Sequence, residues 1–137
     1  MFKLIKITGA RTNVPEPITL DIDGVIPYTA GNLYYLGDDA LSNTPYTEYD
    51  MKFIPLETVA PNSGKTKLCG YFVNENMIFE ADIYNDFSNI KVGNILSGHI
   101  DSNGDIDGAN SSSGSEVMLI AKNEARSRRK ILVALKW

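Results

Sequence analysis

The sequence predicts an all-β fold, a single compact β-sandwich or β-barrel built from short strands. All six prolines lie in the first half of the chain, and they leave no long uninterrupted window there for a helix. The apolar segments between the glycines and prolines are short and rich in Ile, Val, Tyr and Phe, the residues favoured in strands. Such segments recur roughly every 8–12 residues, a spacing typical of sandwiches and barrels.

Each expected strand can be placed on the chain. We expect strands over residues 2–8, 17–22, 33–37, 51–59, 94–100, 116–123 and 129–137, and a hairpin over 67–83. Asn74-Glu75-Asn76 is a plausible tight loop for that hairpin. Pro55 indicates an edge strand or a bulge in 51–59, because proline cannot donate to a sheet ladder. The polar segment 101–115 is expected to be a loop.

The length of 137 residues fits one domain over 1–137. Residues 1–16 are a candidate for an extended N-terminal arm, since residues 11–17 are too rich in proline for a core element. The formal charge of −4 argues against nucleic-acid binding through the overall field. No segment resembles a secretory signal or approaches the ~20 apolar residues of a membrane span. We therefore expect a soluble protein with neither nucleic acid nor membrane as a partner.

Few residues could carry catalysis. His99 is the only histidine and Cys69 the only cysteine, and both lie in apolar strand segments. A Cys-His pair across strands stays open as an alternative, but a buried structural cysteine is the simpler interpretation. The sequence predicts no enzymatic activity and no cofactor.

The segment DSNGDIDGAN (101–110) could bind calcium or could be a turn. Counted from Asn103, an EF-hand loop would place oxygen ligands at Asn103, Asp105 and Asp107 and glycine at the sixth position. Its twelfth position is then Gly114, so the bidentate glutamate is missing. Asn-Gly is a strong turn signal between strands. We favour a turn with no metal, and keep Asn103, Asp105 and Asp107 as alternative ligands.

Two groups of side chains are candidates for partner contact. Tyrosine suits interfaces because it buries a large ring and keeps a polar tip. Five tyrosines cluster between residues 28 and 49, and a basic run follows near the C-terminus. The candidates are Tyr28, Tyr34, Tyr35, Tyr46, Tyr49, Arg126, Arg128 and Arg129. A solvated connection between strands is the simpler interpretation of the basic run.

The C-terminal half has a glycine-marked strand, Val92-Gly93-Asn94-Ile95-Leu96, followed by a turn, a second strand, a variable loop and a final strand of the type Ile-Leu-Val-Ala-Leu. This order of strands and glycines resembles the close of small tailed-phage head proteins. The resemblance covers roughly residues 67–137, and PITLDIDGVIPYTAGNLYYLGDDAL resembles such proteins less specifically. It implies a capsid decoration or auxiliary head protein, a compact β-barrel or sandwich on the outside of an icosahedral shell, often oligomeric and without catalytic residues.

The sequence thus predicts a structural virion protein that binds and stabilises an assembled shell. Its expected partners are the major capsid protein or another virion protein, together with copies of itself. Its expected location is the capsid surface, after synthesis in the host cytoplasm. The alternatives are a calcium- or carbohydrate-binding β-module and a tail or fibre-base component.

Overall fold

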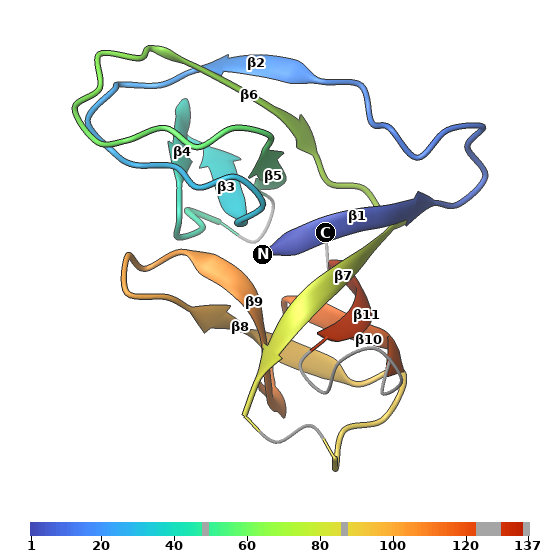
Figure 1. Cartoon of the computed structure of the whole chain (residues 1–137). Helices are drawn as coiled ribbons and strands as arrows, with labels where there is room; N and C mark the ends of the chain where they lie inside the picture. Colours follow the sequence, from blue (N-terminus) through green and yellow to red (C-terminus); the bar gives the residue numbers. More distant parts are fainter. Residues whose placement is uncertain (48–49, 86–87, 123–129, 136–137) are drawn as a thin grey trace.

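The computed structural model describes residues 1–47, 50–85, 88–122 and 130–135. These residues form eleven strands and no helix, so the predicted all-β class is confirmed (Figure 1). The strands are β1 (Phe2–Ile7), β2 (Ile18–Asp21), β3 (Tyr34–Gly37), β4 (Ala40–Ser42), β5 (Met51–Pro55), β6 (Lys67–Phe72), β7 (Met77–Tyr84), β8 (Ile95–Ile100), β9 (Ile106–Ser113), β10 (Val117–Lys122) and β11 (Lys130–Leu135).

The second half of the chain forms a closed barrel. Its strands pair in the cyclic order β7-β11-β10-β8-β9, and a parallel pairing of β9 with β7 closes the ring. That closing seam is short, with only Ile83 opposite Ala109 and Tyr84 opposite Asn110. Strand β1 pairs antiparallel with the earlier part of β7, which makes it the sixth strand of this sheet. Closure leaves the barrel strands with few free edges.

The other strands form a five-stranded antiparallel sheet in the order β2-β6-β5-β3-β4, which lies above the barrel in Figure 1. Strand β5 is internal in this sheet, so the expectation that Pro55 would mark an edge strand is wrong. Pro55 is tolerated because it is the last residue of β5. Residues 73–76 do make a short connection, but they join strands of different sheets. The predicted 67–83 hairpin is therefore a crossing between the two sheets.

Two further expectations need correction. Part of the segment 101–115, expected to be a loop, is strand β9, whose Gly, Asn and Ser residues have low strand propensity. Pairing with β8 on one side and β7 on the other overrides that propensity. Residues 2–7 of the expected arm are strand β1, whose Phe2 side chain is buried. Of the expected arm, Met1 and residues 8–16 lie outside the strands.

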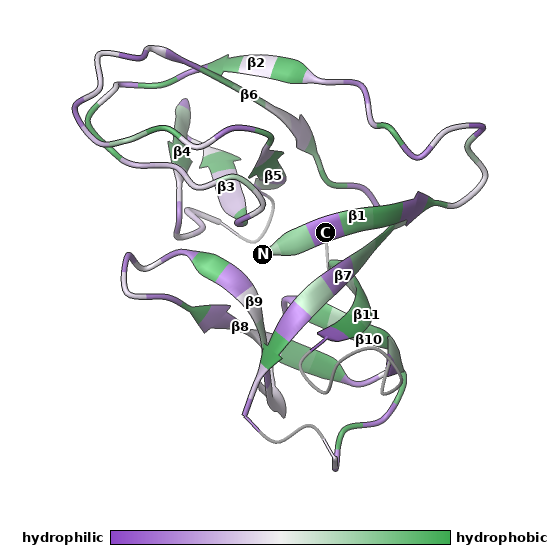
Figure 2. Cartoon of the chain, in the orientation of Figure 1, coloured by the Kyte–Doolittle hydropathy of each residue, from purple (hydrophilic) through white to green (hydrophobic). Residues whose placement is uncertain are grey.

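One hydrophobic core joins the two sheets. Along β7, buried residues alternate with partly exposed ones. Figure 2 shows polar and apolar bands that alternate over the later part of this strand. The larger core cluster contains Phe79, Ile131 and Val133 from the barrel sheet. It also contains Leu33 and Ile54 from the region of the five-stranded sheet. The two sheets therefore pack on a shared apolar interior.

The region between the sheets is also joined through the backbone. The N–H of Leu33 donates to the carbonyl of Ile106 at the start of β9, at 2.9 Å.

Among the residues that the structure describes, no helix is long and apolar enough to cross a bilayer.

Candidate functional site

The aspartate segment forms the turn of the β8–β9 hairpin. The Asp101 Oδ1 atom accepts the backbone N–H groups of Asn103 at 2.8 Å and Asp105 at 3.0 Å. Gly104 has a φ of +83°, the left-handed conformation that glycine adopts without steric cost. The backbone N–H of Asp101 donates to the carbonyl of Asp105 and closes the turn. The turn interpretation of this segment is confirmed.

The Asp105 side chain fastens this turn to the five-stranded sheet. It is only 3% exposed. Its Oδ2 accepts the Tyr34 hydroxyl at 2.6 Å, and its Oδ1 accepts the Asn43 amide at 3.2 Å. Burial, and next the hydrogen bond to Asp105, raise the pKa of Tyr34 well above that of an ordinary phenol. This buried carboxylate is therefore satisfied by protein donors from another sheet, as buried polar groups usually are.

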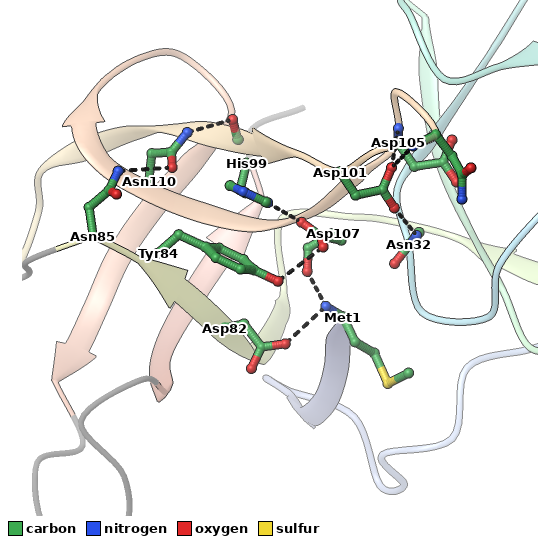
Figure 3. Close-up of polar contacts among 12 residues, drawn as sticks. Met1, Asn32, Asp82, Tyr84, Asn85, His99, Asp101, Asp105, Asp107 and Asn110 are labelled. Carbon is green, nitrogen blue, oxygen red and sulfur yellow. Dashed lines mark hydrogen bonds and ion pairs between the residues drawn. The ribbon is translucent and has the colours of Figure 1, made fainter.

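Asp107 lies two residues further along β9 and contacts different partners. Its Oδ1 lies 2.6 Å from His99 Nδ1, and its Oδ2 accepts the Tyr84 hydroxyl at 3.0 Å (Figure 3). The rings of Tyr84 and His99 stack, with centroids 3.5 Å apart and planes 13° from parallel. Burial, and next the hydrogen bond to Asp107, raise the pKa of Tyr84 to about 12. These three residues connect β7, β8 and β9 where the barrel closes.

Asp82 extends the polar contacts along β7. It accepts a hydrogen bond from Lys130 on β11. It also accepts one from the amino group of Met1 (Figure 3). Burial acts to raise the pKa of Asp82. The hydrogen bond from Lys130 and the two nearby positive charges outweigh burial and hold that pKa below its usual range. The Asp82 carboxylate therefore forms ion pairs with Lys130 on β11 and with the amino group of Met1.

The carboxylates of the turn do not converge on one point. Asp101 binds backbone N–H groups, Asp105 binds Tyr34 and Asn43, and Asp107 binds His99 and Tyr84. Within the described ranges, no group of three or more His, Cys, Asp or Glu side chains is placed to hold a metal ion. The geometry gives no support to Asn103, Asp105 and Asp107 as calcium ligands.

His99 and Cys69 lie on strands of different sheets. His99 belongs to β8 of the barrel, whereas Cys69 belongs to β6, where its backbone N–H donates to the Glu57 carboxylate. The structure does not bring the two side chains together as a nucleophile and base. A carboxylate hydrogen-bonded to a histidine ring can orient that ring as a general base. Here the Asp107 carboxylate also accepts the Tyr84 hydroxyl, so its contacts link strands β7, β8 and β9.

Three of the tyrosines expected at a partner surface are buried. Tyr28, Tyr34 and Tyr35 are 2%, 1% and 5% exposed, so the expectation of partner contact is wrong for them. The Pro- and Gly-punctuated region is traversed by strands β3 and β4, and these rings fill the protein interior. Tyr46 is 52% exposed and stays a contact candidate. Tyr49, Arg126, Arg128 and Arg129 lie outside the described residues.

Sequence reasoning missed an apolar groove at the junction of the two sheets. The groove has a volume of about 320 Å³. Its lining includes Met1, Val14 and Leu56, whose exposed fractions are 53%, 73% and 55%. No local pattern marked the groove, because its lining residues are far apart in the sequence. Such exposed apolar clusters mark interaction surfaces.

Comparisons with protein-family models, with curated proteins and with solved structures found no match.

Proposed function

We propose that this chain is a structural, non-catalytic protein of a phage particle, where it binds shell proteins and copies of itself. The resemblance of residues 67–137 to auxiliary head proteins suggests the particle. The observation that carries the binding role is the apolar groove lined by Met1, Val14 and Leu56. Apolar surface of this kind gains free energy when a partner removes it from water.

The groove has the composition of an interface centre. Its exposed residues lie beside well-packed core residues, since Ile54 and Tyr71 also line it and are almost fully buried. A rigid base holds the exposed side chains in place and lowers the entropy lost on binding. Lys3 also lines the groove and supplies a charge at its rim. Interfaces commonly combine an apolar centre with a charged rim that sets orientation.

Attachment to a shell does not require a tight single contact. A shell presents the same binding surface many times, and an oligomer of this chain would engage several copies at once. Linked weak contacts give high overall avidity when the geometry allows simultaneous engagement. The groove would then serve self-association, shell attachment, or both.

The test uses density-gradient sedimentation of particles from the organism that encodes the chain. The purified chain is added to particles that lack it, and the bound amount per particle is measured by quantitative mass spectrometry. We expect saturable binding at a fixed number of copies. Leu56→Lys should abolish it, because a lysine charge cannot be desolvated in an apolar contact. A chain that stays at the top of the gradient with every particle fraction would refute the virion role.

Val92→Lys is the matched control. Val92 is 66% exposed and lies outside the groove, so the variant makes the same chemical change at an unrelated position. Sedimentation velocity of the purified chain separates the two roles of the groove. A concentration-dependent oligomer that is lost in Leu56→Lys but kept in Val92→Lys would assign the groove to self-association.

A further inference from the structure

We propose that a second pocket, at one mouth of the barrel, binds a neutral polyhydroxylated ligand such as a single pyranose unit of a glycan. The pocket is separate from the apolar groove and shares none of its lining residues. It has a volume of about 400 Å³. That size suits a small ligand, and the mouths of β-barrels are common places for such sites.

Polar and apolar groups line this pocket on different elements. Ser111 and Ser113 come from β9, and Asn89 and Asn94 come from the segment between β7 and β8. The apolar part of the lining includes Ile90 and Leu96, which are 6% and 2% exposed and belong to the larger core cluster. The pocket therefore opens onto the end of the barrel core.

Ser111 and Ser113 line the pocket near the end of β9, and Ser112 between them does not. The pairing of β9 with β8 is irregular here, since Gly98 lies opposite Ala109 and Leu96 lies opposite Ser113. The Ser112 hydroxyl is paired with the Ser97 hydroxyl at 2.8 Å. Within the described part of the chain, the side chains of Ser111, Ser113 and Asn89 form no hydrogen bond, so their polar atoms are available to a ligand.

Asn94 is held in a defined orientation. Its Oδ1 accepts the backbone N–H of Lys91 at 2.8 Å, and its backbone carbonyl accepts the N–H of Leu119 at 2.9 Å. The side-chain oxygen is thus occupied, and the amide NH₂ remains as a donor. A fixed donor beside two hydroxyls and a second amide gives the few, well-placed polar groups that orient a small ligand.

The lining chemistry selects the class of ligand. The lining residues that belong to the described part of the chain are all uncharged. A phosphate or carboxylate ligand is normally bound by cationic side chains, and a hard cation by carboxylates. Sugar hydroxyls both donate and accept, which matches serine hydroxyls and asparagine amides. The apolar C–H face of a pyranose would lie against the aliphatic part of the lining.

The test is an NMR titration of the ¹⁵N-labelled full chain. The probes are the methyl α-glycosides of glucose, galactose and mannose, together with N-acetylglucosamine, and the charged comparators are inorganic phosphate and calcium. We expect saturable shifts of the Asn89 and Asn94 side-chain amide signals with at least one sugar and with neither comparator. Ser113→Ala should weaken that affinity about fivefold, the change expected from one lost hydrogen bond.

Ser112→Ala is the matched control, because it removes a hydroxyl from the neighbouring residue, which does not line the pocket and is paired with Ser97. It should leave the sugar affinity unchanged. Ser111→Ala provides a second variant if Ser113→Ala alters the dispersion of the spectrum. The proposal is overturned if no sugar shifts these signals, if phosphate or calcium shifts them more strongly, or if Ser112→Ala weakens binding as much as the pocket variants.

Discussion

The hydrogen bond between Tyr34 and Asp105 should make a large contribution to stability for a single hydroxyl group. Tyr34 is 1% exposed, its hydroxyl donates to Asp105 at 2.6 Å, and it accepts the backbone N–H of Thr29 at 2.8 Å. Tyr34→Phe keeps the ring and removes both bonds. A hydrogen bond to a charged group contributes about 1.5–3 kcal/mol and a neutral one about 1 kcal/mol. We therefore expect the free energy of unfolding to fall by about 3 kcal/mol.

Urea unfolding monitored by circular dichroism measures this loss, and two other tyrosines calibrate it. The Tyr28 hydroxyl donates to one backbone carbonyl, that of Leu41, at 3.0 Å, so Tyr28→Phe should cost about 1 kcal/mol. Tyr46 is 52% exposed, and Tyr46→Phe should stay within about 0.5 kcal/mol of the parent chain. The expected order of destabilisation is Tyr34, then Tyr28, then Tyr46.

The reasoning fails if Tyr34→Phe is no more destabilising than Tyr28→Phe. It would also fail if Asp105→Asn and Tyr34→Phe were fully additive, because partners in one buried hydrogen bond should show a coupling energy of at least about 0.5 kcal/mol. Either result would mean that the β8–β9 turn is not fastened to the five-stranded sheet through this contact.

Other predictions test the barrel seam and the aspartates. Gly108→Ala would place a Cβ 2.6 Å from the Asp82 carbonyl oxygen and should cost about 1–3 kcal/mol in urea unfolding; an unchanged stability would contradict a tightly packed seam. The folded chain raises the pKa of Tyr84 from 10.0 to about 12, so it keeps a proton that the unfolded chain releases. Stability should fall as pH rises through this interval, less steeply in Tyr84→Phe. Calcium and chelator should leave the melting temperature unchanged in differential scanning fluorimetry, and a calcium-dependent rise would revive the cation site.

The sequence was sufficient for features that depend on local pattern. The Asn103-Gly104 turn signal is a property of neighbouring residues, and the turn appears in the structure. The all-β class followed from the repetition of such signals.

Pairing partners depend on the whole chain and could not be predicted in the same way. A short polar connection after Phe72 is compatible with a hairpin and also with a crossing between two sheets. Only the packing of both sheets determines which of the two the chain forms. Strand β9 was missed because its composition is that of a loop, although two neighbouring strands supply its ladder.

The candidate sites, like the strand pairings, depend on contacts between distant residues that local sequence patterns do not reveal. The buried tyrosines were mistaken for contact residues because proline and glycine spacing does not reveal which side of a strand meets the core. The apolar groove was missed because it joins residues as far apart as Val14 and Leu56. The barrel-mouth pocket likewise unites Asn89 with Ser113, which belong to different elements of the chain.

The pairing of β1 with β7 has a consequence for how the chain is organised. Ile7 lies opposite Met77, and the N–H of Thr8 donates to the carbonyl of Asn76. The end of β1 thus lies beside the start of β7, an arrangement that a tight turn could connect. In this chain the connection between them is instead the whole five-stranded sheet. The sheet is, in effect, a very large insertion into one hairpin. It is not separable, because Leu33 and Ile54 complete the barrel's core. Deleting the insertion would expose that core, and the intact chain should unfold in a single cooperative transition.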